Sequence, residues 1–154
     1  MFLPNRDEAR ALTGREDPNE QAEIMARINP NCTMVITSGK AGSLIRRGEQ
    51  VLRARIFEVD SIDESGSGDA FDAGFLVGML MGWPLEETVQ FASAVGASCT
   101  RALGCHDGVF TYEETLAFLS QHCLDITLAV PPRKSENRDP SRLEADLRLP
   151  RPPG

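Results

Sequence analysis

Asp63-Glu64-Ser65-Gly66-Ser67-Gly68-Asp69-Ala70-Phe71 is the most informative stretch of this chain. It follows an expected strand, Gln50 to Val59, and it precedes an apolar segment that begins at Ala70. A strand, a glycine-rich turn and a helix start together present backbone N–H groups to an anion, because the first four N–H groups of a helix have no partner within it. The helix dipole adds roughly +0.5 charge at the same end. The stretch therefore predicts an anion-binding turn.

Two glycines and one carboxylate give this turn its expected chemistry. Gly66 and Gly68 allow a sharp bend and a close approach to a ligand, and only the small side chain of Ser67 lies between them. Asp69 stands where the next helix, expected over Asp69 to Met81, begins. A purely structural alternative is a loop that ends in an N-cap aspartate. The stretch fits neither the P-loop pattern nor the dinucleotide pattern Gly-x-Gly-x-x-Gly.

With Ala73-Gly74-Phe75 after it, the stretch resembles the C-terminal signature of the ribokinase-like (PfkB) carbohydrate kinases, Asp-Thr-x-Gly-Ala-Gly-Asp-x-Phe. Two positions depart from that signature. Ser67 replaces an alanine of similar size, whereas Glu64 replaces a threonine and adds a negative charge near the place where phosphates would lie. The resemblance implies a three-layer α/β/α ribokinase-like fold, present only as its C-terminal half.

The resemblance also implies ATP-dependent transfer of a phosphoryl group to a sugar or a similar alcohol. Asp69 would accept the proton of the attacking hydroxyl. An anion hole formed by Gly66, Ser67 and Gly68 would stabilise the charge that develops on the phosphoryl group. The region of Asp63 would hold a monovalent cation, K⁺.

Asn5 and Glu8 open the first expected helix, which runs to Leu12 and ends at Gly14. Their spacing is that of a capping box, in which each residue satisfies a backbone N–H of the other. Asn-x-x-Glu at this place also resembles a second PfkB motif, associated with magnesium and phosphate placement. The resemblance implies that both residues help to bind ATP and that Glu8 reaches Mg²⁺ through water. Capping alone would explain the same pair.

A second glycine-containing turn follows the strand expected over Cys32 to Thr37, whose nearly continuous apolar run is typical of a strand buried on both faces. Ser43 to Arg46 returns as a strand, so a β-hairpin turn explains the segment simply. In ribokinase-like enzymes a Thr-x-Gly-x-x-Gly turn at this place lies against the nucleotide. Thr37, Gly39 and Gly42 match that pattern and are therefore candidate nucleotide-binding residues.

Three further helices are expected from the apolar periodicity and the capping signals. They run from Asp17-Pro18 to Asn29, from Leu85 to Ala102 and from Thr111 to about Cys123. The buried stripe of the first of these is expected to consist of Ala22, Met25, Ala26 and Ile28.

Composition excludes several classes of function. The 154 residues suffice for one domain with a real core, and a net charge of −7 argues against a nucleic-acid partner. The longest apolar run, Ala73 to Trp83, is far shorter than the ~20 residues that cross a bilayer, so no membrane partner is expected. No basic region precedes an apolar stretch at the N-terminus, and a cytoplasmic location is the default expectation.

The cysteines are scattered and form no Cys-x-x-Cys pair: Cys32, Cys99, Cys105 and Cys123. Free thiols are therefore expected rather than a disulfide framework. Cys105-His106-Asp107 lacks the spacing of a zinc site.

Two segments are expected along the chain. Residues 1–128 form the C-terminal, nucleotide-binding and catalytic half of a PfkB-type kinase domain. Residues 129–154 hold most of the ten prolines together with many arginines and few apolar residues, which is typical of a disordered tail, with a docking segment as the alternative.

Two functions from different classes follow. One is a truncated sugar kinase that needs its missing N-terminal half, in trans or by formation of a homodimer. The other is a non-catalytic nucleotide- or phosphate-binding module, or an inactive remnant. Whether the chain is an enzyme stays open at this level, and the sugar cannot be named because the implied sugar-binding residues lie in the absent half.

Overall fold

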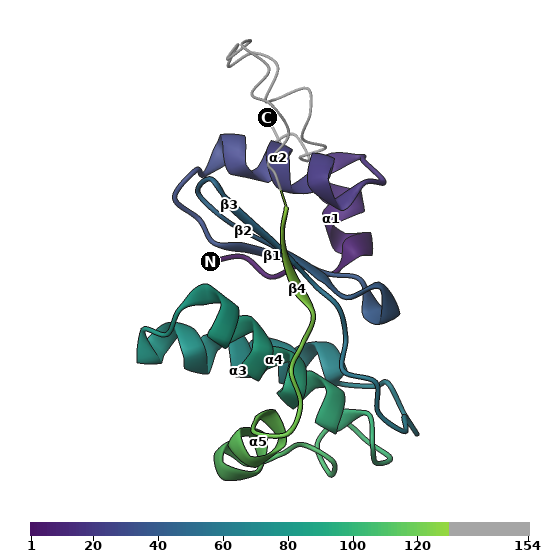
Figure 1. Cartoon of the computed structure of the whole chain (residues 1–154). Helices are drawn as coiled ribbons and strands as arrows, with labels where there is room; N and C mark the ends of the chain where they lie inside the picture. Colours follow the sequence, from purple (N-terminus) through teal and green to yellow (C-terminus); the bar gives the residue numbers. More distant parts are fainter. Residues whose placement is uncertain (130–154) are drawn as a thin grey trace. The chain divides into compact units, whose positions relative to one another are not determined.

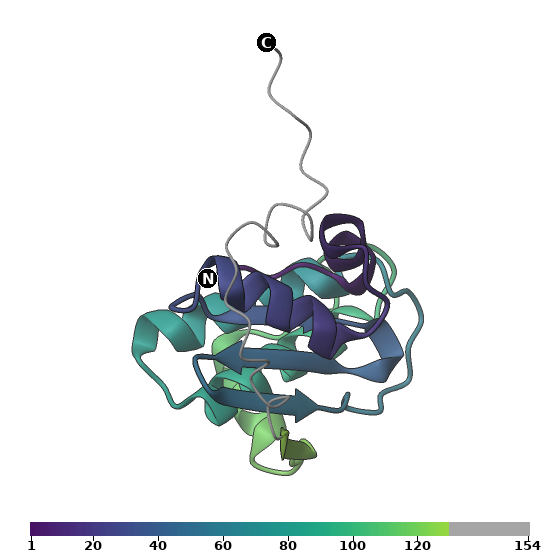
Figure 2. The same cartoon turned by 90° about the horizontal axis from the view of Figure 1, so that it is seen from above.

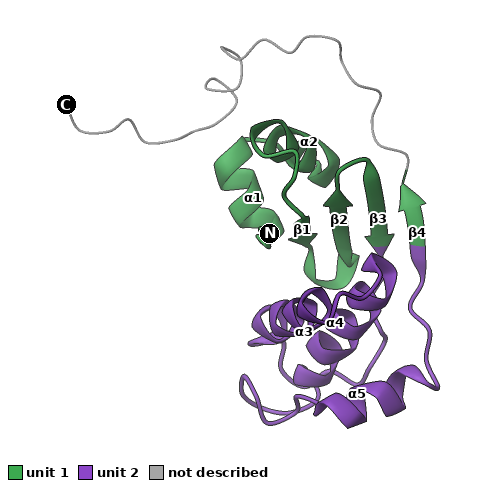
Figure 3. Cartoon of the chain, turned by 90° about the vertical axis from the view of Figure 1, so that its left-hand side faces the viewer, with its two compact units in different colours: residues 1–53, 127–154 green, residues 54–126 purple. Residues whose placement is uncertain are grey.

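The computed structural model describes residues 1–129, which form two compact units. Unit 1 comprises Met1–Arg53 together with the described residues from Thr127 onward, and unit 2 comprises Ala54–Ile126 (Figure 3). Apart from Ala129, the segment expected to be a disordered tail lies outside the described residues.

Unit 1 is a small sheet with two helices (Figure 1). Its sheet has the order β1-β2-β3-β4, and α2 packs on β1 and β2 over one face of the sheet (Figure 2). The elements are α1 (Arg6–Thr13), α2 (Pro18–Ile28), β1 (Met34–Thr37), the short 3₁₀ helix η1 (Gly39–Ala41), β2 (Ser43–Arg47), β3 (Gln50–Ala54) and β4 (Ile126–Ala129).

The predicted hairpin between β1 and β2 is confirmed, with antiparallel pairs from Met34↔Arg46 to Thr37↔Ser43. The N-terminal residues run parallel to β1 on its other side, through bridges Phe2↔Met34 and Asn5↔Thr37. The N–H of Thr37 donates to the carbonyl of Pro4 at 3.2 Å. Helix α1 therefore begins directly where this edge segment ends.

The ends of α1 follow from local sequence. Asn5 caps the N-terminus and Gly14, at φ 69°, ends the helix in the left-handed conformation that glycine adopts without strain. Helix α2 begins at the expected Asp17-Pro18, where the Asp17 side chain accepts a hydrogen bond from the N–H of Asn19. Both helices confirm the predicted boundaries within a residue.

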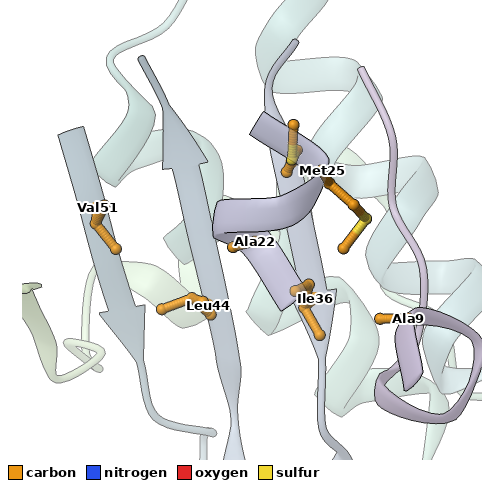
Figure 4. Close-up of a cluster of buried hydrophobic side chains, with 7 residues drawn as sticks. Ala9, Ala22, Met25, Ile36, Leu44 and Val51 are labelled. Carbon is orange, nitrogen blue, oxygen red and sulfur yellow. The ribbon is translucent and has the colours of Figure 1, made fainter. Parts of the chain in front are cut away.

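The core of unit 1 lies between these helices and the sheet (Figure 4). It consists of Ala9, Ala22, Met25, Met34, Ile36, Leu44 and Val51. Ala26 packs against the edge of this cluster, but the prediction that Ile28 is buried is wrong, since 49% of it is exposed at the last position of α2.

Unit 2 consists of α3 (Ser67–Met81), α4 (Leu85–Cys99) and α5 (Tyr112–Leu119). Glycines let α3 and α4 pack closely. A Cβ on Gly74 would lie 2.9 Å from the Cα of Ala92, and one on Gly78 would lie 2.7 Å from the side chain of Thr88. Any larger residue at these two positions would push the helices apart.

The predicted C-terminal ends of three elements are wrong, and β1 and α3 begin at Met34 and Ser67 instead of Cys32 and Asp69. β3 ends at Ala54 instead of Val59, and the N–H of Arg55 makes one more backbone hydrogen bond, to the carbonyl of Asp125. Helix α4 ends at Cys99 rather than Ala102, since the N–H groups of Thr100 and Arg101 donate to carbonyls three residues earlier instead of four. Helix α5 ends at Leu119, earlier than the predicted Cys123.

None of the helices in residues 1–129 combines the length and apolar character that crossing a bilayer requires.

Ile36 and Ile28 form a matched pair for testing the core of unit 1. Ile36 is 0% exposed, so Ile36→Ala should lower the free energy of unfolding by about 2–5 kcal/mol, the usual cost of a cavity in a core. Ile28→Ala removes the same atoms from a half-exposed position and should change it by no more than about 0.5 kcal/mol. Urea titration of both variants measures this, and equal losses would contradict the described core.

Candidate anion-binding site

The turn before α3 bends sharply at Gly66, which has φ 76° and is the N-cap of the helix. We call this bend at Gly66 the hinge. The Ser67 N–H donates to the carbonyl of Glu64 at 3.3 Å, and the Ala70 N–H donates to that of Gly66 at 2.9 Å. Between these two bonds, the amides of Gly68 and Asp69 have no acceptor within residues 1–129. A Cβ placed on Gly68 would meet nothing within 4 Å, and both Gly68 and Asp69 are exposed, so a ligand can approach this part of the turn.

Asp69 is the third residue of α3 and is exposed. The structural alternative that makes it the N-cap is wrong, because Gly66 occupies that position. Its carboxylate makes no hydrogen bond or ion pair with any other described residue. The turn thus combines two unpartnered N–H donors with an unpartnered carboxylate.

The Asp63 carboxylate holds the loop before α3 in place by accepting two hydrogen bonds, which we call the Asp63 brace. One carboxylate oxygen accepts the Ser65 N–H at 3.0 Å, and the other accepts the Gly104 N–H at 3.2 Å. These hydrogen bonds, first those from the backbone and side chain of Ser65 and then that from Gly104, hold the pKa of the Asp63 carboxyl below its ordinary value. The carbonyl of Thr100 accepts the N–H groups of Ile62 and Asp63 at 2.7 and 3.1 Å.

The segment around Cys105 closes on the hinge. A Cβ on Gly66 would lie 2.8 Å from the Cβ of Cys105 and 2.9 Å from its carbonyl oxygen. Behind the loop, the buried thiol of Cys99 donates to the carbonyl of Ser65 at 3.4 Å. The sequence gives no signal that either cysteine contacts this loop, because these contacts join residues that are far apart in the chain.

Asn5 and Glu8 form the predicted capping box in unit 1. The Asn5 side chain accepts the Glu8 N–H at 2.9 Å, and the Glu8 carboxylate accepts the Asn5 N–H at 2.9 Å. The structural explanation of this pair is therefore confirmed. Their part in placing Mg²⁺ and nucleotide stays a prediction.

Thr37, Gly39 and Gly42 lie together at the turn between β1 and β2. Gly39 and Gly42 have φ 52° and 87°, and the Gly42 N–H donates to the carbonyl of Gly39 at 3.0 Å. The bridge Asn5↔Thr37 places the two sets of candidate nucleotide-binding residues beside each other within unit 1. The hinge at Gly66 belongs to unit 2.

Candidate metal ligands do not gather within residues 1–129. In the part of the chain that the structure describes, no three His, Cys, Asp or Glu side chains gather as a metal site would need. Both oxygens of Asp63 and the carbonyl of Thr100 accept N–H groups, and the K⁺ site expected in the region of Asp63 stays a prediction. The four cysteines are free, as predicted.

A glycine-containing turn that leads into a helix start with free amides is a common anion-binding arrangement in α/β proteins that bind phosphate groups. Residues 1–111 match the family described as pfkB family carbohydrate kinase. The chain belongs to this family, and its fold is ribokinase-like α/β, present in part.

Named relatives agree with this assignment. The ribokinase of Haemophilus influenzae is 32% identical over 123 residues, which cover 77% of this chain and 40% of the relative. Arabidopsis thaliana ribokinase, solved with ribose and ATP, superposes with TM-score 0.69 at 26% identity over 77% of this chain and 40% of its own. A candidate ribokinase II of Escherichia coli, solved with ATP and Mg²⁺, shares the fold with TM-score 0.72 at 19% identity, over 79% of this chain and 39% of its own.

The chain spans less than half the length of the curated relatives that it matches. The activity and substrates of those complete proteins are therefore not carried over by the match alone.

Gly66 and Gly68 allow the hinge to be tested by identical substitutions two residues apart. Gly66→Ala forces a side chain into the left-handed region and into Cys105, and it should lower the free energy of unfolding by about 1–3 kcal/mol or more. Gly68→Ala adds a methyl group in open space on a helix and should cost nothing or stabilise slightly. Urea unfolding of both variants decides the matter, and equal effects would rule out the described hinge.

Asp63 predicts a pH dependence of stability. Because its pKa is depressed in the folded protein, its ionised form stabilises the fold above the unfolded-state pKa, and this contribution disappears as pH falls through the folded-state pKa. Asp63→Asn should therefore be less stable than wild type at neutral pH, and the difference should close in acid. Unfolding curves of both proteins across this range measure it. A difference that stays constant with pH would contradict the brace.

Proposed function

We propose that this chain is the nucleotide-binding and catalytic part of an ATP-dependent phosphotransferase that acts on a sugar or a sugar-like alcohol. The observation that supports it most is the pair of unpartnered amides at Gly68 and Asp69, beside an Asp69 carboxylate that no described residue engages. Because the chain belongs to the pfkB family of carbohydrate kinases, we interpret these amides and this carboxylate as groups that act in phosphoryl transfer.

In the proposed reaction the turn at Gly66 stabilises negative charge on the phosphoryl group, and Asp69 accepts a proton. The amides of Gly68 and Asp69, at the positive end of α3, stabilise charge on the transferred phosphoryl group. Their direction is fixed in advance by Gly66 and by the Asp63 brace, so little reorganisation is needed when charge develops. The carboxylate of Asp69 accepts the proton of the attacking hydroxyl.

The nucleotide and its metal would be held by other parts of the chain. Thr37, Gly39 and Gly42 border the nucleotide in this proposal, and Gly39 has room for it because a Cβ there would meet nothing within 4 Å. Mg²⁺, when bound, neutralises phosphate charge. Glu8 would act on it through water, since one of its oxygens already closes the capping box.

Activity would require more polypeptide than this chain supplies. This chain covers 40% of the Haemophilus influenzae ribokinase and 40% of the Arabidopsis thaliana ribokinase, and the resemblance implies sugar-binding residues in the part that it does not cover. The surface of α3 supports such a partner, because apolar side chains are exposed along it at helical spacing: Leu76, Val77, Leu80 and Met81. The missing half in trans or a second copy of the chain would serve, and a cytoplasmic location would suit either.

A non-catalytic nucleotide- or phosphate-binding module is the second candidate. The exposed side chain of Glu64 favours this second candidate. Glu64 belongs to the same turn, because its backbone carbonyl accepts a hydrogen bond from the N–H of Ser67. A negative charge at that position opposes the approach of phosphate.

Asp69→Asn separates the two candidates. In the kinase, phosphorylation of ribose, cytidine or 2-dehydro-3-deoxygluconate, the compounds that relatives' descriptions name, should fall by about 10²–10⁴-fold, with ATP binding retained. Asp60→Asn, at an exposed position outside the turn, should leave both unchanged. Coupled assays and calorimetry with ATP and Mg²⁺ measure this. ATP binding without turnover of any compound, even when the part of Haemophilus influenzae ribokinase that this chain does not cover is supplied in trans, would favour the module. No ATP binding would contradict both.

Glu64→Thr restores the residue that the family signature has at this position. Removing the charge should strengthen binding of ATP by about 2–5-fold at low ionic strength, as expected for one exposed charge near the phosphates. The gain should shrink in added salt, whereas Glu58→Thr, at another exposed glutamate, should bring none. Calorimetric titrations at two salt concentrations test this, and a loss of affinity would show that Glu64 takes part in binding.

A further inference from the structure

Cys99 and Cys105 contact the turn before α3 at Ser65 and Gly66. Neither the family signature nor the proposed reaction involves these two cysteines. Cys99 is the last residue of α4 and is 0% exposed. Its sulfur lies 3.4 Å from the carbonyl oxygen of Ser65 and 3.3 Å from that of Cys105. Cys105 itself is exposed and contacts Gly66 through its Cβ and backbone. One thiol is therefore buried behind the turn and the other is open to solvent on the segment that closes it.

The two sulfurs are within reach of each other. A carbonyl oxygen lies about 2.4 Å from the Cα of its own residue, so the Cys99 sulfur is no more than about 6 Å from the Cα of Cys105. In a disulfide, with an S–S bond of about 2.05 Å, the sulfur of one cysteine lies about 4 Å from the Cα of the other, so the separation needs to shorten by no more than about 2 Å. Gly104, at φ 91°, directly precedes Cys105 and lets the exposed segment adjust. A small movement of this segment would bring the sulfurs together.

We propose that Cys99 and Cys105 form a redox-sensitive pair, which hydroperoxides convert to a disulfide that loosens the anion-binding turn.

The chemistry begins at the exposed residue. The Cys105 sulfur attacks one oxygen of the hydroperoxide and breaks the O–O bond, which yields a sulfenic acid and releases an alcohol, or water from hydrogen peroxide. The sulfur of Cys99 then attacks the sulfenic sulfur and forms the S–S bond. The sulfenic hydroxyl leaves with the Cys99 proton as water, so two thiols have reduced one peroxide. Burial, followed by the nearby Cys105, raises the pKa of the Cys99 thiol, which suits it to the second step rather than the first.

In this proposal, oxidation weakens two hydrogen bonds that hold the turn: one from Cys99 to Ser65 and one from Gly104 to Asp63. The Cys99 thiol loses the proton that it donates to the Ser65 carbonyl. Movement of Cys105 also displaces its neighbour Gly104, whose N–H holds the Asp63 carboxylate. The loop from Asp63 to Gly66 is then held less tightly from both sides. This inference needs no nucleotide and stands apart from the proposed function.

Peptide mapping of the full chain tests the bond. Arg101 lies between the two cysteines, so tryptic digestion without reduction should join peptides 56–101 and 102–133 after treatment with hydrogen peroxide. In denaturant the count of reactive thiols should fall from four to two. Cys105→Ser must abolish the cross-link, whereas Cys123→Ser, which alters the other cysteine of the second peptide, must leave it intact.

Hydrogen exchange tests the consequence. Amides in residues 61–70 should exchange faster in the oxidised wild type than in the reduced protein, and dithiothreitol should restore the slower rate. Cys105→Ser, which keeps Cys99 and its hydrogen bond to Ser65, should show no change on peroxide treatment. Absence of the cross-link, its persistence in Cys105→Ser, or its formation without faster exchange would each overturn the proposal.

Discussion

The left-handed conformation of Gly66 is the constraint on which the candidate site depends. It turns the chain sharply enough for α3 to start one residue later, and it leaves room for Cys105 where any side chain would overlap. Because the helix starts at Ser67, the free amides fall on Gly68 and Asp69, and the Asp69 carboxylate belongs to the same helical turn. A start two residues later would move the free donors past Asp69.

The packing behind the hinge keeps this geometry rigid. Gly74 and Gly78 bring α3 against α4, and Gly96 of α4 accommodates the backbone of Ser67 in return, since a Cβ there would lie 3.1 Å from the Ser67 carbonyl oxygen. The first turn of α3 is thus fixed by close helix contact on one side and by the Asp63 brace on the other. Interior glycines that cost helix stability are compensated by this contact.

Local features of the sequence predicted much of the fold, and long-range contacts account for what it missed. The caps at Asn5 and Thr111 were predictable because their partners lie three residues away. The start of α3 was placed two residues late because Asp69 is a good capping residue, whereas a glycine cap carries no side-chain signal. Gly104, 41 residues from the carboxylate that it binds, cannot be paired with Asp63 by periodicity or spacing.

The most direct test of the central claim is whether the free amides receive the phosphates. Amide chemical shifts of the ¹⁵N-labelled chain, recorded while ATP and Mg²⁺ are added, report this residue by residue. The account predicts that Gly68 and Asp69 show the largest saturable shifts in unit 2 and that Asp69→Asn retains the shift at Gly68. Binding that leaves both amides unmoved would contradict it.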